Sequence, residues 1–128
     1  MREKFLERDT ASHLQSLEAD WKKLLKALNA RFDADLDLES VLFLIGIQEL
    51  GHGYKKYTKD QKLELMHIAI CTLLVPYGYY IYKGRDDDGY PHWEANDLLP
   101  PLNAGQQMAL MKSCIIGYFG EEYFTDQS

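Results

Sequence analysis

The sequence predicts an all-α protein that folds as a single-domain bundle of four main helices. The chain has 128 residues, the length of one domain, and its hydrophobic (46%) and charged (27%) fractions are typical of a globular protein. Apolar residues recur every three or four positions in four segments, and capping residues precede three of these segments. We therefore predict one helical domain over residues 1–128. Its helices are expected at about 10–32, 38–51, 59–83 and 103–120, with a long ordered loop at 84–102.

The first predicted helix is recognised by one narrow apolar seam, which consists of Leu14, Leu17, Trp21, Leu24 and Leu28. The second should begin after Asp37, a favoured N-cap residue. Its central run, Val41–Ile47, is apolar on all sides, which is typical of a helix in the middle of a bundle. Gly46 lies inside that run at a cost of about 1 kcal/mol relative to alanine. Close approach of a neighbouring helix would explain why it is tolerated.

The third and fourth predicted helices each begin with a capping pair, Thr58 with Gln61 and Asn103 with Gln106. Pro76 must kink or break the third helix. Beyond it, residues 77–83 either continue as helix or form a short strand for which the sequence offers no partner. The segment 84–102 is longer than ordinary loops, and such loops are often functional. It contains several aromatic and leucine residues, so we expect it to pack across the bundle.

Composition excludes several classes of function. The net charge of −6 argues against general nucleic-acid binding, which requires positive charge to neutralise phosphates. The first nine residues contain no apolar stretch, so we expect no secretory signal. The apolar run from Ile68 to Tyr82 is too short to span a membrane. The two cysteines, Cys71 and Cys114, match neither a disulfide framework nor a zinc motif, and we expect buried, reduced thiols in a cytoplasmic protein.

Two Glu-x-x-His pairs flank the turn between the second and third helices, and they form the candidate metal site: Glu49, His52, Glu64 and His67. Glutamate and histidine three positions apart lie on one helix face, and di-iron carboxylate bundles use this spacing. Those bundles also require a glutamate from each of two further helices, and the last predicted helix has none. At most a mononuclear site for a divalent transition metal is predicted. The competing interpretation is that each Glu–His pair is an ordinary interaction on the surface of its own helix.

A second candidate site is the lysine-rich start of the third helix, with Lys55, Lys56 and Lys59 as anion-binding residues. Positive side chains at a helix N-terminus oppose the helix dipole, whereas an anion there is favoured. The competing interpretation is a solvated turn, because salt screens the dipole. No glycine-rich phosphate loop accompanies the lysines.

The third candidate is an aromatic interaction surface at the far end of the third helix and in the long loop, formed by Tyr79, Tyr82, Tyr90, His92 and Trp93. Tyrosine and tryptophan are enriched among the residues that anchor interfaces. The competing interpretation is a roof of rings over a small bundle, with the hydroxyls in water. The neighbouring run Asp86–Gly89 lacks the ligand spacing of a calcium loop.

No catalytic cysteine or serine motif and no dinucleotide fingerprint is found in the sequence. We therefore expect a non-catalytic protein-interaction or regulatory module without a cofactor, whose partner is another protein or a second copy of the chain, and neither nucleic acid nor a membrane. The alternative is a metal-binding, metal-dependent enzymatic domain that uses the four Glu and His residues.

Overall fold

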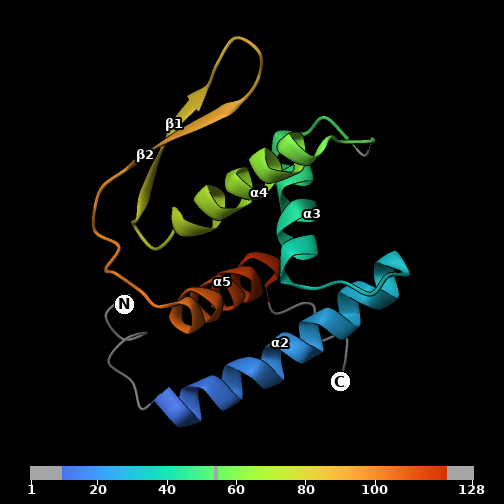
Figure 1. The fold of residues 1–128 in the computed structure, drawn as a ribbon, viewed down its shortest axis with the longest axis vertical. Helices are drawn as coiled ribbons and strands as arrows, with labels where there is room; N and C mark the ends of the chain where they lie inside the picture. Colours follow the sequence, from blue (N-terminus) through green and yellow to red (C-terminus); the bar gives the residue numbers. More distant parts are fainter. Residues whose placement is uncertain (1–9, 54, 121–128) are drawn as a thin grey trace. The chain divides into compact units, whose positions relative to one another are not determined.

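The computed structural model describes residues 10–53 and 55–120, and for residues 10–14 it describes the backbone only. Within this part the chain is mainly helical, as predicted, with a small two-stranded hairpin in addition. The elements in chain order are α2 (Thr10–Phe32), α3 (Leu38–Leu50), α4 (Lys59–Leu74), β1 (Tyr80–Arg85), β2 (Pro91–Ala95) and α5 (Ala104–Phe119) (Figure 1). None of the described helices is both long enough and apolar enough to cross a membrane.

Contacts divide the described part of the chain into two compact units, one within residues 1–36 and 101–128 and the other within residues 37–100. The prediction of one domain over residues 1–128 stays a prediction. The first unit contains α2 and α5. The predicted seam of α2 is confirmed for its described side chains, because Leu17, Trp21, Leu24 and Leu28 are all buried. Leu14 belongs to the residues whose side chains are not described. Lys112 of α5 lies 2.6 Å from the Glu18 carboxylate of α2, which joins the two helices by an ion pair.

The second unit contains α3, α4 and the hairpin. The caps predicted for its helices are confirmed: the Asp37 carboxylate accepts a hydrogen bond from the Ser40 N–H at 2.9 Å, and Thr58 and Gln61 form a reciprocal capping box. The predicted close approach at Gly46 is confirmed as well. A methyl carbon at this position would lie 2.6 Å from the carbonyl carbon of Leu65 in α4, and closer still to its oxygen. Glycine therefore allows α3 and α4 to pack backbone against backbone.

The prediction that the third helix runs over 59–83 with a kink is wrong. Helix α4 ends at Leu74, and Pro76 stands directly after its C-cap residue Val75. A turn follows in which Gly78 adopts a left-handed conformation (φ 82°) and donates its N–H to the Val75 carbonyl. A proline at this point removes a helical hydrogen bond, so the chain leaves the helix. Cys71 and Cys114 are buried, as predicted, and they form no disulfide.

The predicted loop over 84–102 is partly wrong too, because its middle supplies the partner strand that the sequence did not reveal. Strand β1 pairs antiparallel with β2, with Tyr82 opposite Trp93 and an irregularity in the register at Lys83. The turn between the strands is held by Asp86, whose carboxylate accepts hydrogen bonds from the N–H groups of Asp88 and Tyr90, both at 3.0 Å. Gly89 completes the turn with a positive φ of 87°, which L-residues rarely adopt.

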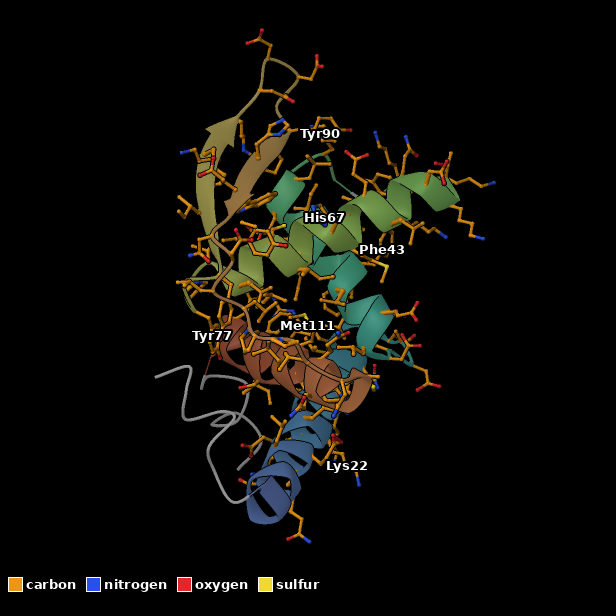
Figure 2. All side chains as sticks on the ribbon, turned by 60° about the vertical axis from the view of Figure 1, so that its left-hand side comes forward. Lys22, Phe43, His67, Tyr77, Tyr90 and Met111 are labelled. Carbon is orange, nitrogen blue, oxygen red and sulfur yellow. The ribbon has the colours of Figure 1, made fainter. Side chains whose placement is uncertain are left out.

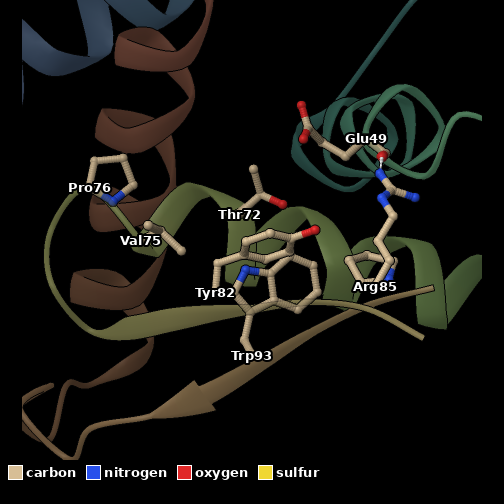
Figure 3. Close-up of a pocket in the computed structure, with 8 residues that line it drawn as sticks. Glu49, Thr72, Val75, Pro76, Tyr82, Arg85 and Trp93 are labelled. Atoms are coloured by element: carbon tan, nitrogen blue, oxygen red, sulfur yellow. Dashed lines mark hydrogen bonds between the residues drawn. The ribbon is translucent and has the colours of Figure 1, made fainter. Parts of the chain in front are cut away.

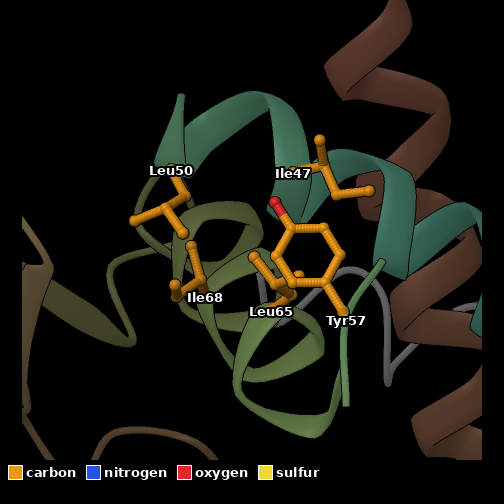
Figure 4. Close-up of a cluster of buried hydrophobic side chains, with 5 residues drawn as sticks. All are labelled: Ile47, Leu50, Tyr57, Leu65 and Ile68. Atoms are coloured by element: carbon orange, nitrogen blue, oxygen red, sulfur yellow. The ribbon is translucent and has the colours of Figure 1, made fainter. Parts of the chain in front are cut away.

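The hairpin is attached to the helices of its own unit at two places. Arg85 donates hydrogen bonds to the carbonyl oxygens of Leu50 (3.1 Å) and Glu49 (2.6 Å), and so caps the end of α3, where the helix dipole favours a cation. Tyr90 and Trp93 pack against a buried cluster under the hairpin. This cluster, shown in Figure 4, consists of Ile47, Leu50, Tyr57, Leu65 and Ile68.

Candidate functional site

Two hollows adjoin the hairpin in the unit of residues 37–100, and Trp93 and Pro91 line both of them. Both are open on the surface of this unit. The smaller hollow measures about 330 Å³ and the larger about 430 Å³, which is the lower part of the range for ligand pockets. Their other lining residues differ in chemistry, so each is described separately.

The smaller hollow has an apolar and aromatic wall, which is formed by Val75, Pro76, Tyr82 and Trp93 (Figure 3). The rings of Tyr82 and Trp93 are opposite each other in the register and have centroids 5.9 Å apart. Tyr82 is 49% exposed, so much of its ring faces solvent. Glu49 and Arg85 line the other end, where the Arg85 guanidinium is held by the α3 carbonyls. The guanidinium is therefore a fixed structural cap as well as part of the wall.

The larger hollow combines aromatic rings with ionisable groups. Helix α4 contributes Glu64, His67 and Cys71, and the hairpin contributes Asp86, Tyr90 and His92. Figure 2 labels His67 on α4 and Tyr90 on the hairpin. Tyr80 and Trp93 complete the aromatic part of the wall. The hollow thus brings residues of one helix face together with residues of both strands.

Two pairs of polar groups stand in this wall. On α4, the Cys71 Sγ lies 3.5 Å from His67 Nε2, one helical turn away. On the hairpin, His92 Nε2 lies 2.8 Å from Asp86 Oδ2. The hydrogen bond from His92, followed by that from the Tyr90 N–H, holds the pKa of Asp86 below its ordinary value of 3.8. Asp86 is therefore a carboxylate at neutral pH.

Cys71 is not an activated nucleophile. Burial raises the pKa of its thiol from 9.0 to about 11, because a thiolate would lose its hydration, and the residue is only 1% exposed. The thiol is therefore protonated at neutral pH in spite of the neighbouring imidazole. Nucleophilic catalysis requires the thiolate, so the His67–Cys71 pair is better explained as a structural contact at the floor of the hollow.

The four residues of the predicted metal site are not brought together. Glu49 lines the smaller hollow, whereas Glu64 and His67 line the larger one. His52 is exposed in the segment after α3, where its ring meets that of Tyr90 edge to face at 5.6 Å. Among the described residues, no three His, Cys, Asp or Glu side chains are placed so that they could hold a metal ion. The physical reason is that the hairpin lies over the face of α4 that carries Glu64 and His67. The prediction had expected this face to lie against α3.

Of the predicted anion-binding residues, Lys59 is the first residue of α4, and Lys55 and Lys56 lie in the segment before it. Lys55, Lys56 and Lys59 are exposed, and the Lys55 ammonium lies 5.5 Å from the centroid of the Tyr57 ring. The capping box satisfies the N–H of Gln61, one of the groups that an anion would otherwise bind. Anion binding at this turn stays a prediction.

Four of the five residues of the predicted aromatic surface are accessible on the hairpin: Tyr82, Tyr90, His92 and Trp93. Tyr79 is an exception, because it is only 5% exposed and cannot offer its ring to a partner. Sequence reasoning missed Asp86 and Arg85 as parts of the site. The signal that could have found them is Asp88-Gly89, a frequent hairpin turn, flanked by the alternating residues of β1 and β2.

Comparison with known proteins adds no family to this description. No family model matches the chain, and searches of the curated proteins and of the solved structures find no significant similarity.

Proposed function

We propose that the unit of residues 37–100 is a non-catalytic protein-interaction module, and that its smaller hollow receives an apolar side chain of a partner peptide. The observation that carries the proposal is the pair of rings, Tyr82 and Trp93, which stand beside Val75 and Pro76 in an open, largely apolar wall. Interfaces are commonly anchored by aromatic residues that bury an apolar group in such a pocket.

Size and rigidity support this proposal. A volume of about 330 Å³ suits one or two side chains better than a large cofactor. The wall is held in place before binding, because Arg85 ties β1 to the end of α3 and Trp93 packs on the buried cluster. A preorganised pocket loses little side-chain entropy when a partner binds.

The non-catalytic part of the proposal is supported by the Cys71 thiol, whose raised pKa disfavours nucleophilic chemistry. The alternative of a metal-dependent enzyme with Glu49, His52, Glu64 and His67 gains no support from the geometry, because these residues belong to different places. Metal analysis of the dialysed protein tests this alternative directly. Bound zinc, iron or nickel near one equivalent would favour it over the proposed interaction module.

The proposal is tested with peptides selected from a random display library against the full chain. Binding of a selected peptide is measured by fluorescence anisotropy for the wild type, Tyr82→Ala and Ile81→Ala. Ile81 is the matched control, because it is similarly exposed (47%) but points to the opposite side of β1. We expect Tyr82→Ala to weaken binding at least tenfold and Ile81→Ala less than twofold. Failure to select any peptide, or equal effects of the two variants, would refute the proposal.

A second copy of the chain is the other protein partner that the sequence suggested. Sedimentation of the wild type and Tyr82→Ala over a range of concentrations examines this case. A dimer that weakens in Tyr82→Ala and persists in Ile81→Ala would identify the partner as another copy of the chain.

A further inference from the structure

The larger hollow differs from the smaller one in charge. Its lining includes two carboxylates, Glu64 from α4 and Asp86 from the hairpin, and none of the described residues that line it is a lysine or an arginine. The smaller hollow, in contrast, has the Arg85 guanidinium in its wall. The two carboxylates give this lining its negative charge, although His92, which also lines the hollow, already contacts Asp86 Oδ2 through its Nε2 at 2.8 Å.

Aromatic rings complete this negative lining. Tyr80 of β1, Trp93 of β2 and Tyr90, which directly precedes β2, all line the larger hollow. The face of an aromatic ring is electron-rich and attracts a cation, most strongly when the cation is weakly hydrated. Several rings around one cavity, with carboxylates beside them, are the arrangement by which proteins recognise alkylated ammonium groups.

Two of the three rings and one carboxylate are held in place without a ligand. Tyr90 is fixed by its edge-to-face contact with His52 and by the buried cluster, and Trp93 by the same cluster and by Tyr82. The Asp86 carboxylate is fixed at Oδ1 by the N–H groups of Asp88 and Tyr90 and at Oδ2 by His92. The floor at Ile68 and Cys71 is apolar or neutral and adds no competing positive charge.

From these contacts we propose that the larger hollow is a binding site for an alkylammonium group, held between the rings of Tyr80, Tyr90 and Trp93 and balanced by Glu64 and Asp86. The group could belong to a free small amine or to the alkylated lysine side chain of a peptide, since both present the same chemistry. This site does not depend on the proposed partner of the smaller hollow, because Tyr82 lines only that hollow.

The test follows the indole N–H signals of the full chain by nuclear magnetic resonance during titration with choline. The chain contains two tryptophans, and Trp21 lies in the other unit, so its signal is an internal control. The neutral isostere 3,3-dimethyl-1-butanol has the same shape as choline without the charge. We expect choline to shift the Trp93 signal alone and the isostere to bind at least tenfold more weakly. Equal affinities would show a merely apolar pocket and overturn the proposal, as would an unchanged Trp93 signal.

Variants then locate the charge. We expect Glu64→Gln to weaken choline binding at least threefold and Glu94→Gln to leave it within a factor of 1.5. Glu94 is the matched control, because it is an exposed carboxylate on β2 that lines neither hollow. Equal effects of the two variants would indicate only the overall charge of the chain and would overturn the site.

Two further measurements separate the sources and the two proposals. A peptide that contains trimethyl-lysine and binds more than tenfold tighter than choline would identify a side chain as the source, whereas equal or weaker binding would favour a free amine. Val75→Ala should leave choline binding unchanged, because Val75 lines only the smaller hollow. If choline binding is lost in that variant, the cation occupies the smaller hollow and the assignment is wrong, whatever the outcome of the peptide selection.

Discussion

Substitution of Gly46 by alanine tests the close packing of α3 on α4. A Cβ there would lie 2.6 Å from the Leu65 carbonyl carbon, about 1 Å inside the ordinary carbon–carbon contact distance. The neighbour is backbone, so no rotamer change can relieve the overlap, and the helices must move apart. Overpacking of this kind costs about 1–3 kcal/mol, and separation also opens gaps in the buried cluster around Leu65 and Ile68. Against this stands a helix-propensity gain of about 1 kcal/mol.

We therefore expect Gly46→Ala to lower the free energy of unfolding by about 2 kcal/mol, measured by urea denaturation with far-ultraviolet circular dichroism. The melting temperature should fall on the order of 10 °C, since domains of 60–100 residues lose roughly 4–8 °C per kcal/mol and domains of 150–250 residues roughly 2–4 °C. Gly117→Ala is the matched control, because Gly117 is also helical but a Cβ there meets no atom within 4 Å. It should be neutral or up to about 1 kcal/mol more stable. If Gly46→Ala is as stable as Gly117→Ala, the helices do not approach as described.

Three other predictions concern the hairpin and the floor of the larger hollow. Arg85→Met should cost about 1–2 kcal/mol in urea unfolding, because it removes the cap of α3, whereas Lys83→Met on the same strand should change stability by less than about 0.5 kcal/mol. After replacement of Cys114 by alanine, the reaction of Cys71 with a disulfide reagent can be followed at pH 8. It should be at least about 100-fold slower in the folded than in the urea-unfolded protein, because a pKa of about 11 instead of 9.0 lowers the thiolate fraction by that factor. The stability that the neutral Cys71 thiol contributes is present below pH 9 and is lost as the pH rises through 11. A reaction rate of the folded protein within tenfold of the rate of the unfolded protein would contradict the burial of Cys71. The pKa of the Asp86 carboxyl should lie below 3.8 in a carbon-detected titration and move upward in His92→Ala, which removes the imidazole donor. The stability that this carboxylate contributes is present above pH 3.8 and is lost as the pH falls through the lowered pKa. An unmoved midpoint in His92→Ala would exclude His92 as the cause.

Local signals in the sequence were sufficient for the helix starts. Asp37, Thr58 and Asn103 each stand at the N-cap that was predicted, because capping depends on side chains within three residues of the helix start. Gly46 also predicted a close contact between helices, since a glycine in the middle of an apolar helix indicates a close neighbour. Local signals were not sufficient to place the end of α4, because Pro76 allows either a kink or a break. Which of the two occurs depends on whether the residues after Pro76 can pair with another strand.

The hairpin could not be derived in the same way. A strand is stabilised by hydrogen bonds to another segment, so Tyr80–Arg85 is a strand only because Pro91–Ala95 lies beside it. The proline at the start of β2 and the acidic turn before it made that segment look like a loop. The candidate site inherited this error, because Glu64 and His67 face the hairpin and not the Glu49 end of α3.

By itself the sequence determined where the helices begin, which face of α2 is apolar, and that α3 meets a close neighbour at Gly46. These properties depend on contacts between residues near one another in the chain, or on one residue type. Only the tertiary structure decided that the aromatic segment folds over α4, that Arg85 caps α3, and that Glu64 and Asp86 line one hollow. These arrangements join residues up to 36 positions apart, and such long-range pairing leaves no periodic trace in the sequence.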